Sequence, residues 1–121
     1  MDWTFRSDQP IYLQLQQHLS EAIVNGSYTP GQRMPSVRDI ALDAGVNPNT
    51  VQRALAELER DGLVFSQRTS GRFVTDDPER IRQARESMAK EKVDEFLKAM
   101  GKIGLSRRDA IEFLEKEEEP T

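Results

Sequence analysis

The sequence has no cysteine among its 121 residues, and its only histidine is His18. Without cysteine there is no disulfide framework and no thiolate metal site. No run of apolar residues approaches the roughly 18 to 20 that cross a membrane, and the N-terminus lacks the basic and apolar pattern of a signal peptide. The chain also offers no nucleophile paired with a base, no cluster of metal ligands and no phosphate-binding loop. We therefore expect a cytoplasmic protein that is not an enzyme, has no membrane contact and needs no metal or other cofactor.

A large basic excess is missing as well. The chain carries 17 Lys and Arg against 21 Asp and Glu, a net charge of −4. Residues 1–75 contribute −1 of this charge, from seven Arg, no Lys and eight acidic residues, and residues 76–121 contribute −3. This balance argues against a protein that binds any polyanion through charge alone. If the partner is nucleic acid, we expect a compact basic face on a nearly neutral body.

Residues 36–61 contain two short helical patterns separated by a tight turn. Ser36 can cap the first helix, with Asp39 three residues later, and Gly45 can end it. Asn47 can cap the second helix, and Pro48 suits its first position. Both patterns have apolar residues at helical spacing; in the second helix these are Val51, Ala54, Leu55 and Leu58. Two such helices, the second opening with polar side chains, are typical of a helix-turn-helix that enters the major groove of DNA.

The flanking segments complete a winged helix. An amphipathic helix is expected to begin near Pro10 and to stop at Gly26. Residues 63–65 and 71–74 predict two strands of a hairpin with a polar connection, in the place that a wing occupies. A long charged helix is expected over residues 79–100, a break over residues 101–104, and a last helix capped by Ser106. Residues 115–121 form an acidic tail that we expect to be frayed.

The predicted fold is therefore mainly α with a small β-hairpin wing. We place a winged helix-turn-helix DNA-binding domain over residues 1–75 and a helical dimerisation segment, with its acidic tail, over residues 76–121.

At this level of detail the chain resembles the GntR family of winged-helix transcription factors, and most of all its short YtrA-type branch. The matching blocks are Pro10-Ile11-Tyr12, Met34-Pro35-Ser36-Val37-Arg38, Asn47-Pro48-Asn49-Thr50-Val51, Asp61-Gly62-Leu63, and Gly71 with Phe73-Val74. They extend over about residues 9–75. The resemblance implies a bacterial dimeric regulator, usually a repressor. It also implies DNA contacts from Arg38, from the start of the second helix of the helix-turn-helix, and from Gly71 in the wing.

The residues that we predict to contact DNA lie in the helix-turn-helix and the wing. Asparagine and glutamine suit adenine edges, arginine suits guanine or phosphate, and a threonine methyl can touch thymine. Asn49, Thr50 and Arg53 share one helix face, whereas Gln52 lies to the side and is expected nearer a phosphate. The full set is Ser36, Arg38, Asn47, Asn49, Thr50, Gln52, Arg53, Arg68, Gly71 and Arg72.

Structural roles are the alternatives for several of these residues. Arg38 can pair with Asp39 or Asp43 on the surface instead of binding DNA. Asn47 is explained by capping alone. Arg68 and Arg72 either reach the minor groove and phosphates or form a charged hairpin edge that discourages aggregation.

The C-terminal segment has more apolar residues than two helices can bury between themselves. The predicted dimerisation residues are Ile81, Met88, Val93, Phe96, Leu97, Met100, Ile111 and Leu114. A two-fold homodimer would bury this excess and present two recognition helices to a palindromic operator. We expect either a small-molecule effector at that interface or no conventional ligand. The rival function is a protein–protein interaction module on a winged-helix scaffold, which the acidic balance favours.

Overall fold

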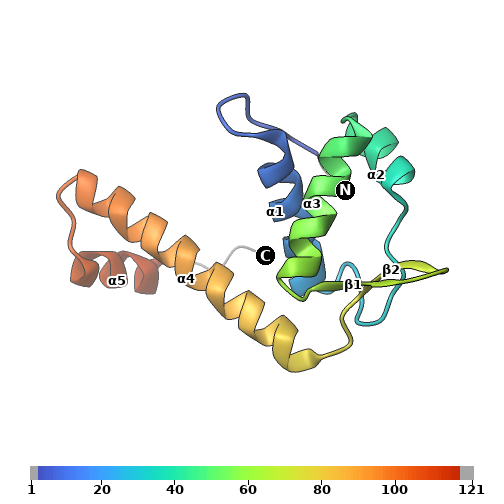
Figure 1. Cartoon of the computed structure of the whole chain (residues 1–121). Helices are drawn as coiled ribbons and strands as arrows, with labels where there is room; N and C mark the ends of the chain where they lie inside the picture. The colour runs from blue at the N-terminus through green and yellow to red at the C-terminus, as the bar shows by residue number, and fades with distance from the viewer. Residues whose placement is uncertain (1–2, 118–121) are drawn as a thin grey trace. The chain divides into compact units, whose positions relative to one another are not determined.

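The computed structural model describes residues 3–117, and within them the chain forms five helices and a two-stranded antiparallel sheet (Figure 1). The predicted mainly α fold with a hairpin wing is confirmed. The elements, in chain order, are α1 (Ile11–Val24), α2 (Val37–Ala44), α3 (Pro48–Arg60), β1 (Val64–Gln67), β2 (Gly71–Val74), α4 (Pro78–Lys102) and α5 (Arg107–Lys116). The chain divides into two compact units, residues 1–84 and 85–121, which are described separately below. The division into two domains at residue 75 stays a prediction.

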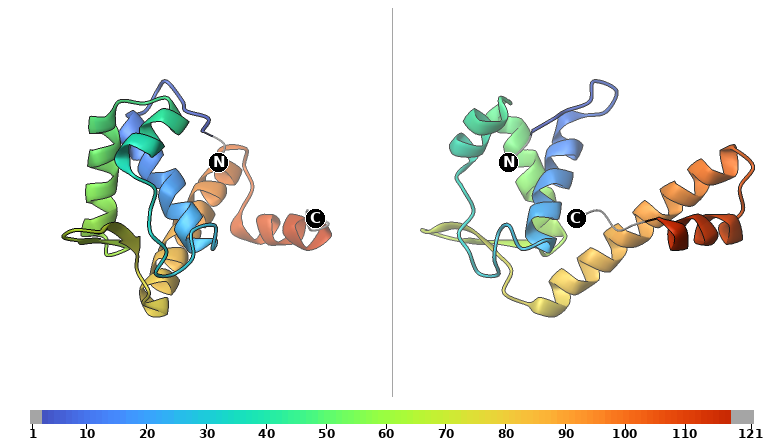
Figure 2. Two further views of the ribbon diagram at one scale, coloured as in Figure 1. Left: turned by 90° about the vertical axis from the view of Figure 1, so that its right-hand side faces the viewer. Right: turned by 180° about the vertical axis from the view of Figure 1, so that it is seen from behind.

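The core of the first unit lies between α1 and α3, which run side by side in both views of Figure 2. Its largest fully buried side chains are Leu15, Leu19, Ile23, Val51, Leu55, Leu58 and Val74. Each buried aliphatic side chain stabilises the fold by about 1.5–3 kcal/mol. Because the apolar stripe of α3 is used in this core, the polar side chains of that helix face outward. The first turn of α4 also belongs to this unit, and Ile81 there is only 6% exposed.

Local capping fixes where α2 and α3 begin, as the sequence predicted. The Oγ of Ser36 accepts a hydrogen bond from the backbone N–H of Asp39 at 3.0 Å. Gly45 ends α2 in the left-handed conformation, with φ of 69°. The Oδ1 of Asn47 accepts from the N–H of Asn49 at 2.8 Å, and Pro48 opens α3. The turn between the two helices is therefore set by the backbone conformation of Gly45 and by the Asn47 cap.

The hairpin pairs Val64 with Val74 and Gln67 with Gly71, so β1 runs two residues beyond the predicted end at residue 65. The strand extends to Gln67 because the pairing with β2 continues to Gly71. A feature that the sequence did not predict lies on the other edge of β2. There the N–H of Met34 donates to the Arg72 carbonyl, and that of Val74 donates to the Gln32 carbonyl, both at 2.8 Å. Residues 32–34 thus attach the wing to the segment that leads into α2.

The second unit is a helical hairpin made by the rest of α4 and α5. The predicted break over residues 101–104 is confirmed at residues 103 and 104 but is wrong for residues 101 and 102, because α4 continues to Lys102 and the chain turns at Gly104, with φ of +83°. A glycine inside a helix costs only about 1 kcal/mol, which a helix of 25 residues tolerates. A capping box between Ser106 and Asp109 starts α5. The predicted frayed tail is wrong for residues 115 and 116, which are helical, and its residues 118–121 lie outside the described part of the chain.

Candidate nucleic-acid interface

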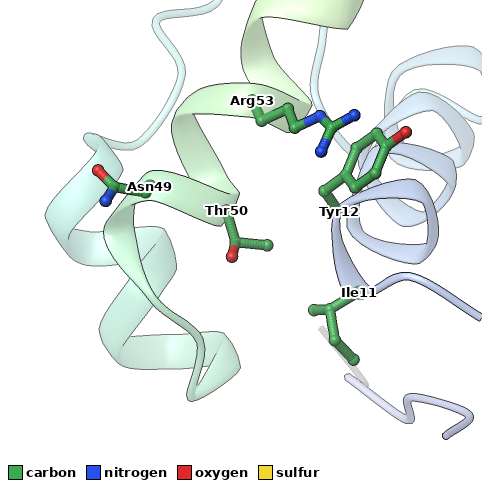
Figure 3. Close-up of a pocket in the computed structure, with 5 residues that line it drawn as sticks. All are labelled: Ile11, Tyr12, Asn49, Thr50 and Arg53. Carbon is green, nitrogen blue, oxygen red and sulfur yellow. The ribbon is translucent and has the colours of Figure 1, made fainter.

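The first polar cluster of interest joins α3 to the start of α1. Figure 3 shows Thr50 and Arg53 projecting from α3 toward Tyr12 and Ile11. Together with Asn49 these side chains line a hollow of about 280 Å³. Asn49, Thr50 and Arg53 thus line the same hollow, although Figure 3 shows the Asn49 amide pointing away from the other two side chains.

The guanidinium of Arg53 lies over the ring of Tyr12, with its carbon 3.6 Å from the ring centroid. A cation held over an aromatic face is attracted by the ring quadrupole, and at an exposed site the gain is about 0.5–1 kcal/mol. The contact restricts the long Arg53 side chain and leaves the edges of the guanidinium for other partners. From the sequence, Tyr12 was named only as part of the block Pro10-Ile11-Tyr12 that carries the family resemblance. Its role beside Arg53 was missed because their contact joins two helices.

A second cluster ties the wing to α3. The Arg72 guanidinium donates from Nε to Glu59 Oε1 at 2.7 Å and from Nη2 to Gln52 Oε1 at 3.0 Å. The hydroxyl of Ser66, in β1, donates to the same Glu59 oxygen. The hydrogen bond from Ser66, followed by that from Arg72, lowers the pKa of Glu59 from its ordinary value. We call these four residues the wing latch.

The wing latch changes the interpretation of two predicted DNA contacts. Arg72 is held within the protein, with its side chain 25% exposed, and Gln52 has its carbonyl oxygen engaged. Glu59 was not among the predicted site residues. Because it is 13 positions from Arg72 in the sequence, only the hairpin register brings the two together.

A third group lies where the segment before α2 meets the wing. Arg33, Ser36, Gly71 and Arg72 help to line a hollow of about 500 Å³. Gly71 has φ of +100°, and a Cβ there would lie 3.3 Å from Nε of Arg33. Both the backbone angle and this close approach favour glycine. Arg33 was not a predicted contact, although its position beside two predicted ones places it in the same surface.

Arg38 lies exposed on α2. Within residues 3–117 it makes no hydrogen bond or ion pair, so the alternative pairing with Asp39 or Asp43 is not formed. Asp43 instead accepts a hydrogen bond from the Trp3 indole at 2.6 Å. Arg68, in the turn between the strands, is likewise exposed and has no partner in the described residues. These two cations are available to a ligand.

Residues 3–117 hold no group of three or more potential metal ligands, and none of their helices is long and apolar enough to cross a membrane. The imidazole of His18 makes edge-to-face contacts with the rings of Trp3 and Phe5.

The second unit carries an exposed apolar face. Phe113 is 53% exposed and Ile103 is 71% exposed, and neither was among the predicted dimerisation residues. They help to line a hollow of about 360 Å³ with Phe96, Met100, Leu105, Leu114 and Glu117. Of the predicted dimerisation residues, Val93, Phe96, Ile111 and Leu114 are exposed, whereas Met88, Leu97 and Met100 are half-buried. Ile81 has to be removed from that set, because its side chain already packs inside the first unit.

Comparison with known proteins agrees with this architecture. Residues 11–74 match the model of a family described as bacterial regulatory proteins, gntR family. The chain is 36% identical to the uncharacterized HTH-type transcriptional regulator YhcF of Bacillus subtilis over 93% of each chain. It is 34% identical to the HTH-type transcriptional repressor YtrA of the same organism, over 76% of this chain and 72% of that one.

Solved structures give the same result. A GntR family transcriptional regulator from Listeria monocytogenes superposes with a TM-score of 0.87 and 36% identity, covering 94% of this chain and all of that one. The DNA-binding domain of AraR, in complex with operator ORE1, matches with a TM-score of 0.54 and 27% identity, over 62% of this chain and 94% of that one.

Proposed function

Because the chain belongs to the gntR family of bacterial regulatory proteins, we propose that this transcriptional regulator binds a specific DNA operator through α3 and its wing. The family and the relatives named above are regulators of transcription and not enzymes. The relatives YtrA, a repressor, and AraR, whose domain was solved on an operator, support DNA binding and repression here. A cytoplasmic location is part of the proposal, since bacterial promoters lie there.

The observation that carries the proposal is the outward face of α3. Its N-terminal half presents Asn49, Thr50 and Arg53 together, while its apolar stripe is fully used in the core. An α-helix fits the major groove, and its N-terminal residues reach base edges in helix-turn-helix proteins. With Arg53 held over Tyr12, an arginine–guanine contact would be made by a side chain that is already partly ordered.

Phosphate contacts would then fix the register of α3 on the duplex. Arg38 and Arg68 are exposed and unpaired in the described residues, and Arg33 lies beside Gly71. Ser36 and Asn47 serve first as helix caps, so we assign them to orienting α2 and α3. The net charge of −4 means that these few cations, rather than a general attraction, would supply the electrostatic part of binding.

A homodimer on a palindromic operator is the second part of the proposal. The apolar face of the second unit exposes large apolar side chains around one hollow, among them Ile103, Phe113 and Leu114, and such exposed apolar patches mark interaction sites. A second copy of the same face would cover it with two-fold symmetry, and two recognition helices would read two half-sites. The apolar hollow in this face is the site that we assign to any small-molecule effector.

The experiment that tests the proposal is binding of the purified protein to DNA from its own promoter region over a salt series. Arg38→Ala should weaken binding about tenfold. It should also reduce the slope of log Kd against log salt concentration by about the amount that one phosphate contact contributes. Arg60→Ala is the matched control, because Arg60 is an exposed arginine at the other end of α3 that pairs with Glu57. Footprinting would then give the operator and its symmetry.

Absence of binding by the wild type at low salt would contradict the proposal. The winged helix would then be assigned to a protein partner instead.

A further inference from the structure

The wing latch places a carboxylate between the two parts of the proposed interface. Glu59, on α3, receives hydrogen bonds from Arg72 of β2 and Ser66 of β1. The side chains of Glu59 and Arg72 are 32% and 25% exposed, so the ion pair is partly shielded from water. Such a pair holds its geometry better than a fully exposed one, which contributes little. The wing is therefore fastened to the recognition helix in the free protein.

The latch also determines which way the amide of Gln52 faces. Its Oε1 accepts from Arg72 Nη2 at 3.0 Å, and its Nε2 has no partner within the described residues. An amide with its oxygen engaged offers its two N–H donors. Gln52 is exposed on α3, so these donors are open to a ligand of that helix.

We propose that Glu59 is a positioning residue for DNA recognition, holding Arg72 so that Arg72 turns the Gln52 amide into a hydrogen-bond donor toward the operator. The inference rests on the proposed function of α3. Glu59 itself touches no base or phosphate in this scheme. It acts through Arg72, which the latch makes a brace between wing and helix.

The chemistry of the partner follows from the donor. Guanine presents two acceptors, O6 and N7, in the major groove, and a phosphate oxygen is also an acceptor. Adenine requires the amide oxygen to accept from its N6 amine in the usual bidentate pairing. The Gln52 oxygen keeps a second lone pair, but the latch turns this oxygen toward Arg72 of β2, and the amide should therefore favour an acceptor, either a guanine edge or a phosphate.

A double-mutant cycle on the promoter fragment separates this role from a merely structural one. Gln52→Ala should weaken binding of the wild type about tenfold, but it should cost only about twofold in a Glu59→Gln background, where the amide is no longer oriented. Glu57→Gln is the matched background, because it removes the same charge from the same helix and Glu57 pairs only with Arg60 among the described residues. In the Glu57→Gln background, Gln52→Ala should again weaken DNA binding about tenfold.

Selection of binding sites from a randomised duplex identifies the acceptor. Loss of a guanine preference at one position per half-site in Gln52→Ala and Glu59→Gln, but not in Glu57→Gln, would assign a base contact. Weakening that is equal for all sequences would assign a phosphate. An equal cost of Gln52→Ala in all three backgrounds, or no cost in the wild type, would overturn the inference while leaving the proposed function intact.

The latch can also be tested without DNA. In the free protein, the Arg72 Nε–H proton should exchange slowly with solvent in the wild type and in Glu57→Gln, and at least several times faster in Glu59→Gln. Unchanged exchange in Glu59→Gln would overturn the latch itself. If the wild type bound no DNA while this difference persisted, the proposed function would fail and the latch would stand.

Discussion

Replacing Tyr12 by leucine tests whether the ring prepares Arg53 for binding. The guanidinium lies 3.6 Å from the ring centroid at an exposed site, where such a contact is worth about 0.5–1 kcal/mol. If that energy orders Arg53 before binding, Tyr12→Leu should raise the Kd for operator DNA about two- to fivefold. Arg53→Ala, which removes the contact with DNA itself, should cost about 1–3 kcal/mol.

Two controls make this prediction specific. Tyr12→Phe keeps the aromatic face and should leave the Kd unchanged, whereas a direct contact from the Tyr12 hydroxyl would make it behave like Tyr12→Leu. In an Arg53→Ala background, Tyr12→Leu should have no further effect. Fluorescence anisotropy at one salt concentration measures all five proteins. If Tyr12→Leu raised the Kd as much in the Arg53→Ala background as in the wild type, the reasoning would be refuted, because the ring would then act through another group.

Three further predictions concern stability and assembly. Ser36→Ala removes the cap of α2 and should lower the free energy of unfolding by about 0.5–2 kcal/mol, measured by urea denaturation; an unchanged midpoint would contradict the capping role. Phe113→Glu should give a monomer in sedimentation, whereas Ser87→Glu, at an exposed position with Gln83, Lys90 and Glu91 one turn away, should leave a dimer. The lowered pKa of Glu59 means that its stabilising contribution is complete above the ordinary value of 4.5 and is lost as the pH falls through the lower pKa of the folded state. The unfolding temperature of the wild type should therefore exceed that of Glu59→Gln above pH 4.5, and this excess should disappear as the pH falls below 4.5. An excess that is the same at all pH values would contradict the ion pair.

Features that depend on a few neighbouring residues were predictable from the sequence. The starts of α2 and α3 follow from Ser36 and Asn47, because each cap bonds to a backbone group two or three residues away. The end of α2 follows from Gly45 for the same reason. The apolar spacing of α3 likewise identified its buried face, and hence the polar face opposite.

Features that depend on residues far apart in the sequence were not predictable in this way. The pairing of residues 32–34 with β2 joins segments about 40 positions apart, and no local signal marks that segment as a strand. Gln52 and Arg72 are 20 positions apart, so their hydrogen bond requires the final position of the hairpin. Ile81 has helical spacing like that of its neighbours, and only the packing of the first unit distinguishes a core residue from an interface residue there.

The hydrogen bond between Gln52 and Arg72 also bears on protein engineering. Recognition helices are often treated as portable parts, whose outward residues can be grafted onto another scaffold to transfer a binding preference. Here the amide that faces outward from α3 is oriented by an arginine that the wing supplies. A graft of residues 48–60 alone would leave that amide free to rotate, so the smallest portable unit of this protein is the helix together with its hairpin.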